Sequence, residues 1–215
     1  MDDQTELNDA FVDVLVHSGI LRSKRIIDAF KHIKRHLFVR KEDMEFAYQD
    51  MPLPLARDST ISQPSTVAVM LEYLDIREDD KVLEIGTGSG WNAALIGYCV
   101  GSEGSVVSLE IDNELANNAK DNISKTEIKN VKIICKDGTK GHIEDAPYDR
   151  IIYTASVKKI PGEVLSQLKV GGILLAPVGD EWIQVLTSMK KIDENSFDEV
   201  HLGYFQFVPL RGIGG

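Results

Sequence analysis

The chain has 215 residues, 43% hydrophobic and 27% charged, which is an ordinary globular composition and the length of one large α/β domain with at most a small appendage. Its formal net charge of −10 argues against a nucleic-acid partner, because binding to phosphate needs clustered Lys and Arg. The acidic, polar start is unlike a signal peptide and no apolar run has the length of a membrane span, so we expect a cytoplasmic protein with no membrane partner.

Residues 1–60 are expected to form a helical cap followed by an irregular crossing segment. Apolar residues recur at helical spacing over residues 6–20 and again over 22–39. The second stretch carries one apolar stripe, made of Ile26, Ile27, Phe30 and Ile33. It is also the most basic part of the chain, and we interpret its Lys and Arg residues as the solvated face of a helix. The prolines of Pro52–Leu55 then favour extended or turn geometry.

A Ser/Thr-rich turn leads directly into the next apolar helix. This helix is predicted from the spacing of Val67, Met70, Leu71 and Leu74. It should begin near Pro64, which places Ser62 close to the N-cap. A helix N-terminus also suits a carboxylate, because its first amides are unpaired. Ser62 is therefore either a simple cap or part of a site.

From Lys81 onward, short apolar strands alternate with helices. The strands are predicted over residues 81–86, 105–112, 131–137, 148–156 and 171–179, and the helices over residues 92–100, 113–124 and 161–169. Residues 181–193 and 197–210 are typical of a hairpin. The pattern predicts a doubly wound, mostly parallel α/β sheet with an antiparallel C-terminal hairpin, and ligands at the carboxyl ends of its strands. Residues 61–215 are expected to form this domain as one compact unit.

Glycines follow the first of these strands and precede a helix. Gly86, Gly88 and Gly90 stand where a backbone passes close to a ligand and helix amides point outward. A dinucleotide fingerprint would have Gly or Ala in place of Trp91, which is either core or pocket wall here. The spacing therefore favours a ligand without a pyrophosphate.

Two acidic residues end the next strands. Glu110 ends the second strand, where a carboxylate accepts both hydroxyls of a ribose. Asp137 ends the third, where an acid accepts an adenine amino hydrogen, although an ordinary turn aspartate is also consistent. Together they describe an adenosine pocket without a phosphate site. The commonest ligand of that description is S-adenosylmethionine, a reactive methyl donor.

Other chemistries find little support. The five histidines share no metal-like spacing, so we expect no metal, and only His142 follows the expected site closely. Cys99 and Cys135 lie in apolar contexts and are expected to be buried free thiols. From these residues alone, the alternatives are a methyltransferase acting on a small molecule or tRNA, a nicotinamide oxidoreductase, and a nucleoside-binding protein without catalysis.

Several segments, taken in order over roughly residues 25–212, resemble the protein-L-isoaspartate O-methyltransferase family. The most specific are "PLPL", "TISQP" and "FVPLRG", because the glycine loop is shared by many methyltransferases. The resemblance implies a Rossmann-like class I methyltransferase fold and S-adenosylmethionine as cofactor. It further implies transfer of a methyl group to the α-carboxylate of L-isoaspartyl residues in damaged proteins and peptides. The ester then loses methanol to form a succinimide, which partly hydrolyses to aspartate.

The resemblance also assigns roles to residues. Ser62 matches the active-site hydroxyl. The cofactor residues are Glu84, Gly86, Gly88, Gly90, Glu110, Asp137 and Gly138. The substrate residues are Thr60, Ile61, Gln63, Phe207, Val208, Pro209 and Leu210. The chain departs from the family pattern at Lys136, where Gly is frequent, and at Thr139, where an aromatic residue is frequent.

An isoaspartyl α-carboxylate has a pKa near that of a terminal carboxyl, about 3.5, and is ionised at pH 7. No general base is then needed. We expect this carboxylate near Ser59–Gln63, at the helix N-terminus, with the methyl group presented from the Gly86–Gly90 side. The enzyme is expected to act as a monomer.

Overall fold

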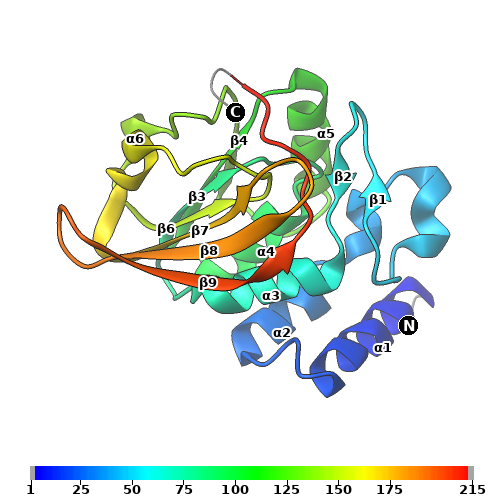
Figure 1. Ribbon diagram of the computed structural model, residues 1–215. Helices are drawn as coiled ribbons and strands as arrows, with labels where there is room; N and C mark the ends of the chain where they lie inside the picture. Colours follow the sequence, from blue (N-terminus) through cyan, green and yellow to red (C-terminus); the bar gives the residue numbers. More distant parts are fainter. Residues whose placement is uncertain (1–2, 213–215) are drawn as a thin grey trace.

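The computed structural model describes residues 3–212 of the chain. Within these residues the centre is a seven-stranded sheet in the order β5-β4-β3-β6-β7-β8-β9 (Figure 1). The strands are β3 (Lys81–Ile85), β4 (Ser105–Glu110), β5 (Val131–Cys135), β6 (Tyr148–Tyr153), β7 (Leu168–Gly179), β8 (Gln184–Lys191) and β9 (Phe197–Phe205). Strands β3 to β7 pair in parallel, and β8 and β9 add an antiparallel hairpin. The predicted fold class is therefore confirmed.

Helices and 3-10 turns surround the sheet (Figure 1). The α-helices are α1 (Asp3–His17), α2 (Lys24–His32), α3 (Pro64–Leu74), α4 (Trp91–Val100), α5 (Asn113–Ser124) and α6 (Gly162–Leu165). The 3-10 turns are η1 (Arg35–Phe38), η2 (Lys41–Phe46) and η3 (Ile143–Asp145). The strand order reverses at β3, because β4 pairs with one edge of β3 and β6 pairs with the other. Ligands of such sheets bind beside this point, at the carboxyl ends of the strands.

Both faces of the parallel part of the sheet are buried, whereas β9 at one edge has only exposed and half-buried residues. Val82 of β3 packs into a core shared with α1, α2, α3 and α4, whereas Leu83 packs into a second core on the opposite face. Successive side chains of a strand point to opposite faces, so a strand that reads as continuously apolar is covered on both sides. The cap helices belong to the first core, through residues such as Leu15 and Phe30.

The predicted long helix over residues 22–39 is wrong. Helix α2 ends at His32, Ile33 is extended, and η1 follows. Its basic residues are also not all solvated, since Arg35 is only 1% exposed. The Arg35 guanidinium donates to backbone carbonyls of Ala47 and Met51, at 2.8 and 3.0 Å. A helix continuing from α2 would not bring that side chain inward.

The helix predicted over residues 161–169 is also much shorter, because α6 ends at Leu165. Gln167 is buried, and its amide donates to the carbonyls of Lys140 and Glu163. The chain then joins the sheet at Leu168, which pairs with Tyr148. The face of the sheet that carries Leu83 is consequently covered by α6 together with loops.

The crossing segment contains an unpredicted hairpin, β1 (Leu53–Pro54) with β2 (Thr60–Ile61). Arg57 and Asp58 at its tip both have φ of +59°, the left-handed conformation of a tight two-residue turn. A substituent on Gly88 would lie 3.7 Å from Leu55 of this hairpin, so the hairpin lies over the glycine loop.

Two further sequence-based expectations concern cysteines and membranes. Cys99 is buried, and burial raises the pKa of its thiol to about 12. Cys135 is exposed, contrary to expectation, because it is the last residue of β5, which is the edge strand of the sheet. Among residues 3–212, the helices are all too short or too polar to cross a membrane.

Candidate active site

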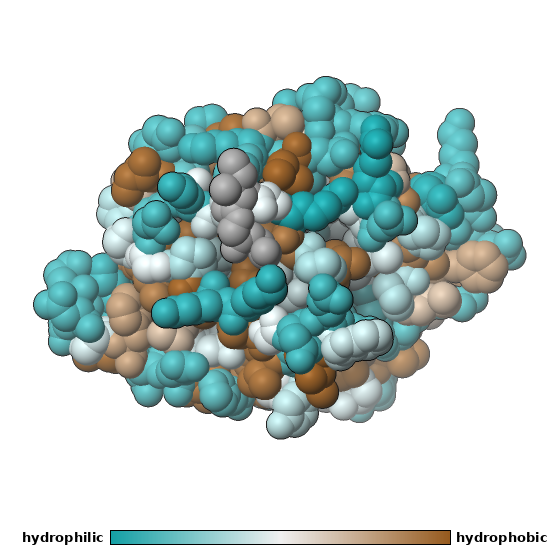
Figure 2. All heavy atoms as spheres, turned by 45° about the horizontal axis from the view of Figure 1, so that its top comes forward, coloured by the Kyte–Doolittle hydropathy of each residue, from teal (hydrophilic) through white to brown (hydrophobic). Residues whose placement is uncertain are grey.

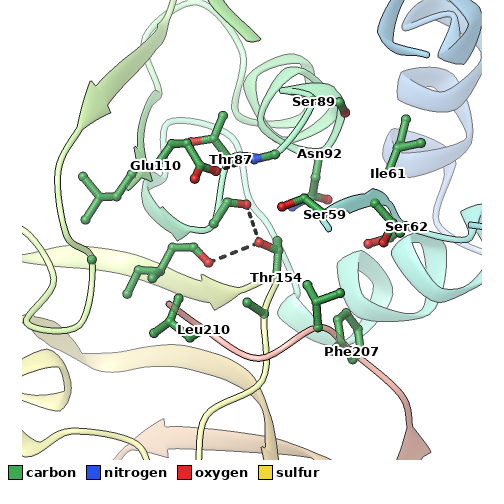
Figure 3. Close-up of a pocket in the computed structure, with 18 of the residues that line it drawn as sticks. Ser59, Ile61, Ser62, Thr87, Ser89, Asn92, Glu110, Thr154, Phe207 and Leu210 are labelled. Atoms are coloured by element: carbon green, nitrogen blue, oxygen red, sulfur yellow. Dashed lines mark hydrogen bonds between the residues drawn. The ribbon is translucent and has the colours of Figure 1, made fainter. Parts of the chain in front are cut away.

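A cavity opens at the carboxyl ends of β3, β4 and β6 (Figure 3). It encloses about 890 Å³, including open solvent at its mouth. Its walls include the β2 segment Ser59–Ser62, the glycine loop, the end of β4, Thr154 after β6, and the C-terminal segment Phe207–Arg211. The predicted cofactor and substrate segments, which are far apart in the sequence, therefore line one cavity.

The glycine loop has a conformation that side chains oppose. Gly86 has φ +105°, and a Cβ there would collide with the hydroxyl of Thr154. Gly90, the N-cap of α4, has φ +85°, and a Cβ there would lie 3.1 Å from the Cβ of Ala119. Gly86 and Gly88 line the cavity, but Gly90 does not. Gly90 therefore shapes the turn and is not part of the cavity wall.

Glu110 stands in the cavity wall with both carboxylate oxygens anchored. Oε2 accepts a hydrogen bond from the backbone N–H of Gly88 at 2.9 Å, and Oε1 accepts one from Asp112 at 3.1 Å. The residue is 6% exposed and lines the cavity. Each carboxylate oxygen accepts more than one hydrogen bond, so acceptor capacity remains for hydroxyl groups of a ligand.

Glu84 lies behind the cavity wall, although it was predicted to contact the cofactor. It is fully buried and accepts hydrogen bonds from Asn92 Nδ2, at 2.7 Å, and from Ser108 Oγ. Burial raises the pKa of its carboxyl to about 7. Asn92 itself lines the cavity. Glu84 thus acts on the cavity through the orientation of the Asn92 amide.

Of the two residues predicted at the adenine edge, Asp137 and Gly138, one lines the cavity and the other does not. Gly138 lines the cavity. Asp137 does not, and its Oδ1 accepts hydrogen bonds from the N–H and the hydroxyl of Thr139, at 2.9 and 2.7 Å. The departure from the family pattern at Thr139 is therefore adjacent in structure to the predicted adenine edge. His142 is not part of the cavity wall and instead contacts Asp145.

Ser62 lines the cavity and is not a helix cap. The N-cap of α3 is Gln63, and no side chain makes a capping hydrogen bond there. Across residues 3–212 the Ser62 hydroxyl has no hydrogen-bond partner, whereas its backbone carbonyl accepts from Arg35 at 3.2 Å. The Ser62 hydroxyl is therefore available to a ligand, while the Ser62 backbone is held by its hydrogen bond from Arg35. The simple capping interpretation is wrong.

The predicted binding of a substrate carboxylate at the α3 N-terminus meets a competitor at that helix end. Asp50 already occupies it, accepting from the backbone N–H of Ser65 at 2.8 Å. The amide of Gln63 donates to the same carboxylate at 3.0 Å, and Gln63 is absent from the cavity wall. The positive end of the helix is therefore compensated within the chain. On this side, the hydroxyl groups in the cavity wall include those of Ser59 and Ser62. Thr60 and Ile61 lie between these two serines and also line the cavity.

The C-terminal segment closes the cavity from below in Figure 3. Its backbone is paired with Ser156, which donates to the carbonyl of Val208 at 2.9 Å and accepts from Leu210 at 2.8 Å. Arg211 then donates to the hydroxyl of Ser59 at 2.9 Å. That bond joins the two predicted substrate segments. Phe207, Val208, Pro209 and Leu210 all line the cavity, as expected.

Several wall residues were not assigned from the sequence. They include Thr87, Ser89, Asn92, Thr154 and Arg211. Thr154 lies between Glu110 and Ser62 in Figure 3, and its hydroxyl donates to the carbonyl of Gly86. The sequence did contain a signal for Thr154, because this residue directly follows a predicted strand, where ligands of such sheets bind. Trp91 proves to be both core and wall, being 3% exposed and still in contact with the cavity.

The cavity suits a ligand without phosphates. Among the described residues that line it, Arg211 alone is basic, and Glu110 brings a negative charge. Polyphosphate sites instead gather backbone amides and several cations. Within residues 3–212 there is no cluster of His, Cys, Asp and Glu arranged to hold a metal ion.

Comparison with known proteins agrees with this geometry. The family model described as protein-L-isoaspartate(D-aspartate) O-methyltransferase matches residues 5–213. A protein-L-isoaspartate O-methyltransferase of Methanococcus aeolicus is 43% identical, over 96% of this chain and 95% of its own. The corresponding protein of Methanococcus vannielii is 45% identical, over 91% and 93%.

Solved structures show the same fold. One called protein-L-isoaspartate O-methyltransferase is 31% identical, with a TM-score of 0.88, and the match covers 97% of this chain and 67% of that one. A Plasmodium falciparum structure, described as a complex with S-adenosyl-L-homocysteine, has a TM-score of 0.86 at 22% identity, over 95% and 98%.

Proposed function

The chain belongs to the protein-L-isoaspartate(D-aspartate) O-methyltransferase family, and from that membership we propose which residues perform its reaction. The protein is a repair enzyme: it transfers a methyl group from S-adenosylmethionine to the α-carboxylate of L-isoaspartyl residues in proteins and peptides. The single observation that supports the assignment of roles is that Ser62 and Glu110 line the same cavity.

The cofactor side of the cavity fits an adenosine group. We assign Glu110 to the ribose hydroxyls, because its carboxylate is already oriented by Gly88 and Asp112. Gly138 lies in the wall where an adenine edge would pack, with Asp137 behind it. S-adenosylmethionine supplies a sulfonium-bound methyl group, which is reactive without further activation.

The substrate side is assigned to the Ser59–Ser62 segment and the C-terminal segment. The Ser62 hydroxyl is free to donate to the isoaspartyl carboxylate and so to orient one of its oxygens. Arg211 holds the Ser59 hydroxyl at 2.9 Å and keeps the two segments together. Thr60, Ile61 and Phe207–Leu210 form the walls between them.

Alignment and exclusion of water account for the rest of the catalysis. The attacking carboxylate is ionised at neutral pH, so the residues around it do not have to remove a proton. Its charge is neutralised as the methyl group moves, which makes a dry site favourable if donors keep the carboxylate in line. Phe207 and Trp91, 8% and 3% exposed, supply apolar wall for this purpose.

Methyl transfer from radiolabelled S-adenosylmethionine tests the function. The acceptors are an isoaspartyl peptide and its aspartyl twin, which have the same composition and differ only in the backbone linkage. Label should enter only the isoaspartyl peptide and should be released as volatile methanol at mildly alkaline pH. Stable label, or equal label in both peptides, would contradict carboxyl methylation of isoaspartate.

We further propose that the enzyme acts as a monomer in the cytoplasm. Described residues of a single chain already form both the cofactor side and the substrate side of the cavity wall. The net charge of −10 and the free thiols of Cys99 and Cys135 suit a reducing compartment without a polyanionic partner.

A further inference from the structure

The loop between β7 and β8 exposes two large apolar side chains. Trp182 is 81% exposed and Ile183 is 52% exposed. Tryptophan is seldom exposed to this extent unless it binds something, because its ring is large and mostly apolar. The proposed reaction leaves both side chains without a role.

The tip of this loop is a hydrogen-bonded turn. The carboxylate of Asp180 accepts hydrogen bonds from the backbone N–H groups of Trp182 and Ile183, at 2.9 and 3.1 Å. An aspartate that accepts from residues two and three positions further on closes a tight turn. Trp182 is therefore presented on an ordered turn.

The same loop is tied directly to the active-site wall. Gln184 is fully buried, and its amide Nε2 donates to the carbonyl of Asp180 at 2.6 Å. Its Oε1 accepts from the backbone N–H of Phe207 at 2.7 Å. Phe207 and Val208 line the cavity, and Val208 is 36% exposed at its rim. One buried side chain thus joins the β7–β8 loop, which carries Trp182, to the C-terminal segment of the active-site wall, and Figure 1 shows the loop running next to that segment.

The chemistry of the substrate indicates which groups contact the surface around the cavity mouth. An isoaspartyl residue lies within a polypeptide, so chain must leave the cavity on both sides of the reacting residue. On the face seen in Figure 2, hydrophobic residues form small separate patches, which suits a peptide segment better than a second folded protein.

On the basis of the proposed function, we propose that Trp182 and Ile183 bind an apolar side chain flanking the isoaspartyl residue of the substrate. They act as specificity-determining residues outside the reacting centre. The substrate class follows: isoaspartyl segments with a neighbouring aromatic or aliphatic residue are preferred over those with only small or acidic neighbours. Glu181, which is exposed on the same turn, disfavours acidic neighbours further.

Steady-state methylation of two isoaspartyl peptides tests this role. The short peptide has glycine neighbours, and the long one carries leucine and tyrosine on both sides of the same isoaspartyl residue. Trp182→Ala should lower kcat/KM for the long peptide roughly 5- to 20-fold, through KM, since an aromatic contact contributes about 1–2 kcal/mol. The short peptide should change less than about twofold, and Trp182→Phe should retain most of the preference.

Tyr73→Ala is the matched control, because Tyr73 is another exposed aromatic residue and lies at the far end of α3 from the cavity. It should leave both peptides unaffected. Equal effects of Trp182→Ala on the two peptides, or no effect on either, would overturn the role of Trp182 alone. If the wild-type protein methylates neither peptide, the proposed function fails and this inference fails with it.

Iodide quenching of tryptophan fluorescence gives a readout independent of turnover. The chain has two tryptophans, and Trp91 is only 3% exposed, so the accessible emission comes from Trp182. In the presence of S-adenosylhomocysteine, the long peptide should reduce quenching by at least about half, and the short peptide should not. Unchanged quenching at saturating long peptide would overturn the inference.

Discussion

In the proposed reaction, Ser62 orients the reacting carboxylate without being chemically activated itself. Its hydroxyl has no partner within residues 3–212, while its carbonyl is fixed by Arg35. A donor held in this way costs little reorganisation when a carboxylate arrives. No acid or base needs to accompany it, because the substrate is already charged.

Ser62→Ala should lower kcat on an isoaspartyl peptide roughly 10- to 100-fold, since loss of a hydrogen bond to a charged group costs about 1–3 kcal/mol. Affinity for S-adenosylhomocysteine should stay within about twofold, because Ser62 belongs to the substrate side. Peptide kinetics and calorimetric titration of the product measure the two quantities. Unchanged turnover would remove Ser62 from the mechanism.

Glu84 couples stability to pH. Burial raises the pKa of its carboxyl from 4.5 to about 7, so the folded state holds a proton that the unfolded state has released. The unfolding free energy contributed by this group is therefore fully present below pH 4.5 and is lost as the pH rises through 7. The total loss is about 3 kcal/mol.

Glu84→Gln should remove this loss. Urea unfolding of the wild type and the variant at pH 5 and pH 8 measures the difference, and the comparison with Gln cancels the other titrating groups. The difference in unfolding free energy between the two proteins should change by about 2.5 kcal/mol between these pH values, in favour of the variant at pH 8, because part of the loss has already occurred at pH 5. A gap independent of pH would show that Glu84 is ionised throughout.

At the scale of elements, the β1–β2 hairpin is the part of the cavity wall that lies over the glycine loop. Its tip is held by Arg57, which pairs with Asp112 and Glu114, both at 3.7 Å, and these residues belong to the start of α5. Exposed pairs of this kind contribute little to stability but add to the barrier against opening. We predict that the hairpin, through Leu55, restrains a ligand bound beside the glycine loop.

Arg57→Ala should speed dissociation of S-adenosylhomocysteine by roughly two- to fivefold at low salt, as expected for loss of about 0.5–1 kcal/mol. The effect should fade above about 0.5 M salt, where exposed charges are screened. Stopped-flow displacement measures the rate. Arg77→Ala, which removes an equally exposed pair with Asp75, is the control. A rate that matches this control would mean that the tip contacts do not restrain the hairpin.

For the whole molecule, we propose that residues 1–60 and 61–215 form one cooperative unit. The cap shares the first core with α3 and α4, through Leu15, Phe30 and other apolar residues. Arg35 extends this connection to the active site, because one guanidinium donates to the carbonyls of Ala47, Met51 and Ser62. Burial lowers its pKa to about 10, so it stays charged at neutral pH.

Arg35→Lys should lower the unfolding free energy by about 2 kcal/mol, because an ammonium group cannot reach all three carbonyls. Turnover should fall as well, since the Ser62 backbone loses its support. The control is Arg25→Lys: Arg25 joins α2 to Cys99 at 2.7 Å, away from the cavity, and should affect stability alone. Urea unfolding should show one transition in every variant, and two would contradict a single unit.

Local signals were sufficient for much of this protein. Short apolar runs that alternate with helices predicted strands β3 to β7, because a strand buried on both faces must be apolar throughout. Gly86, Gly88 and Glu110 were identified because a strand end and a glycine turn are local features, and the structure places all three in the cavity wall.

Other features depend on contacts between distant residues, and only the tertiary structure decided them. Arg35 turns inward to carbonyl partners beyond residue 46, and the carboxylate of Asp50 accepts a hydrogen bond at the α3 N-terminus. Arg211 meets Ser59 across 152 positions of sequence. Periodicity records which side of an element is apolar, but not which distant polar group will satisfy a buried charge or an open helix end. The glycine turn and the strands were therefore set by sequence, and the assembled substrate side by packing.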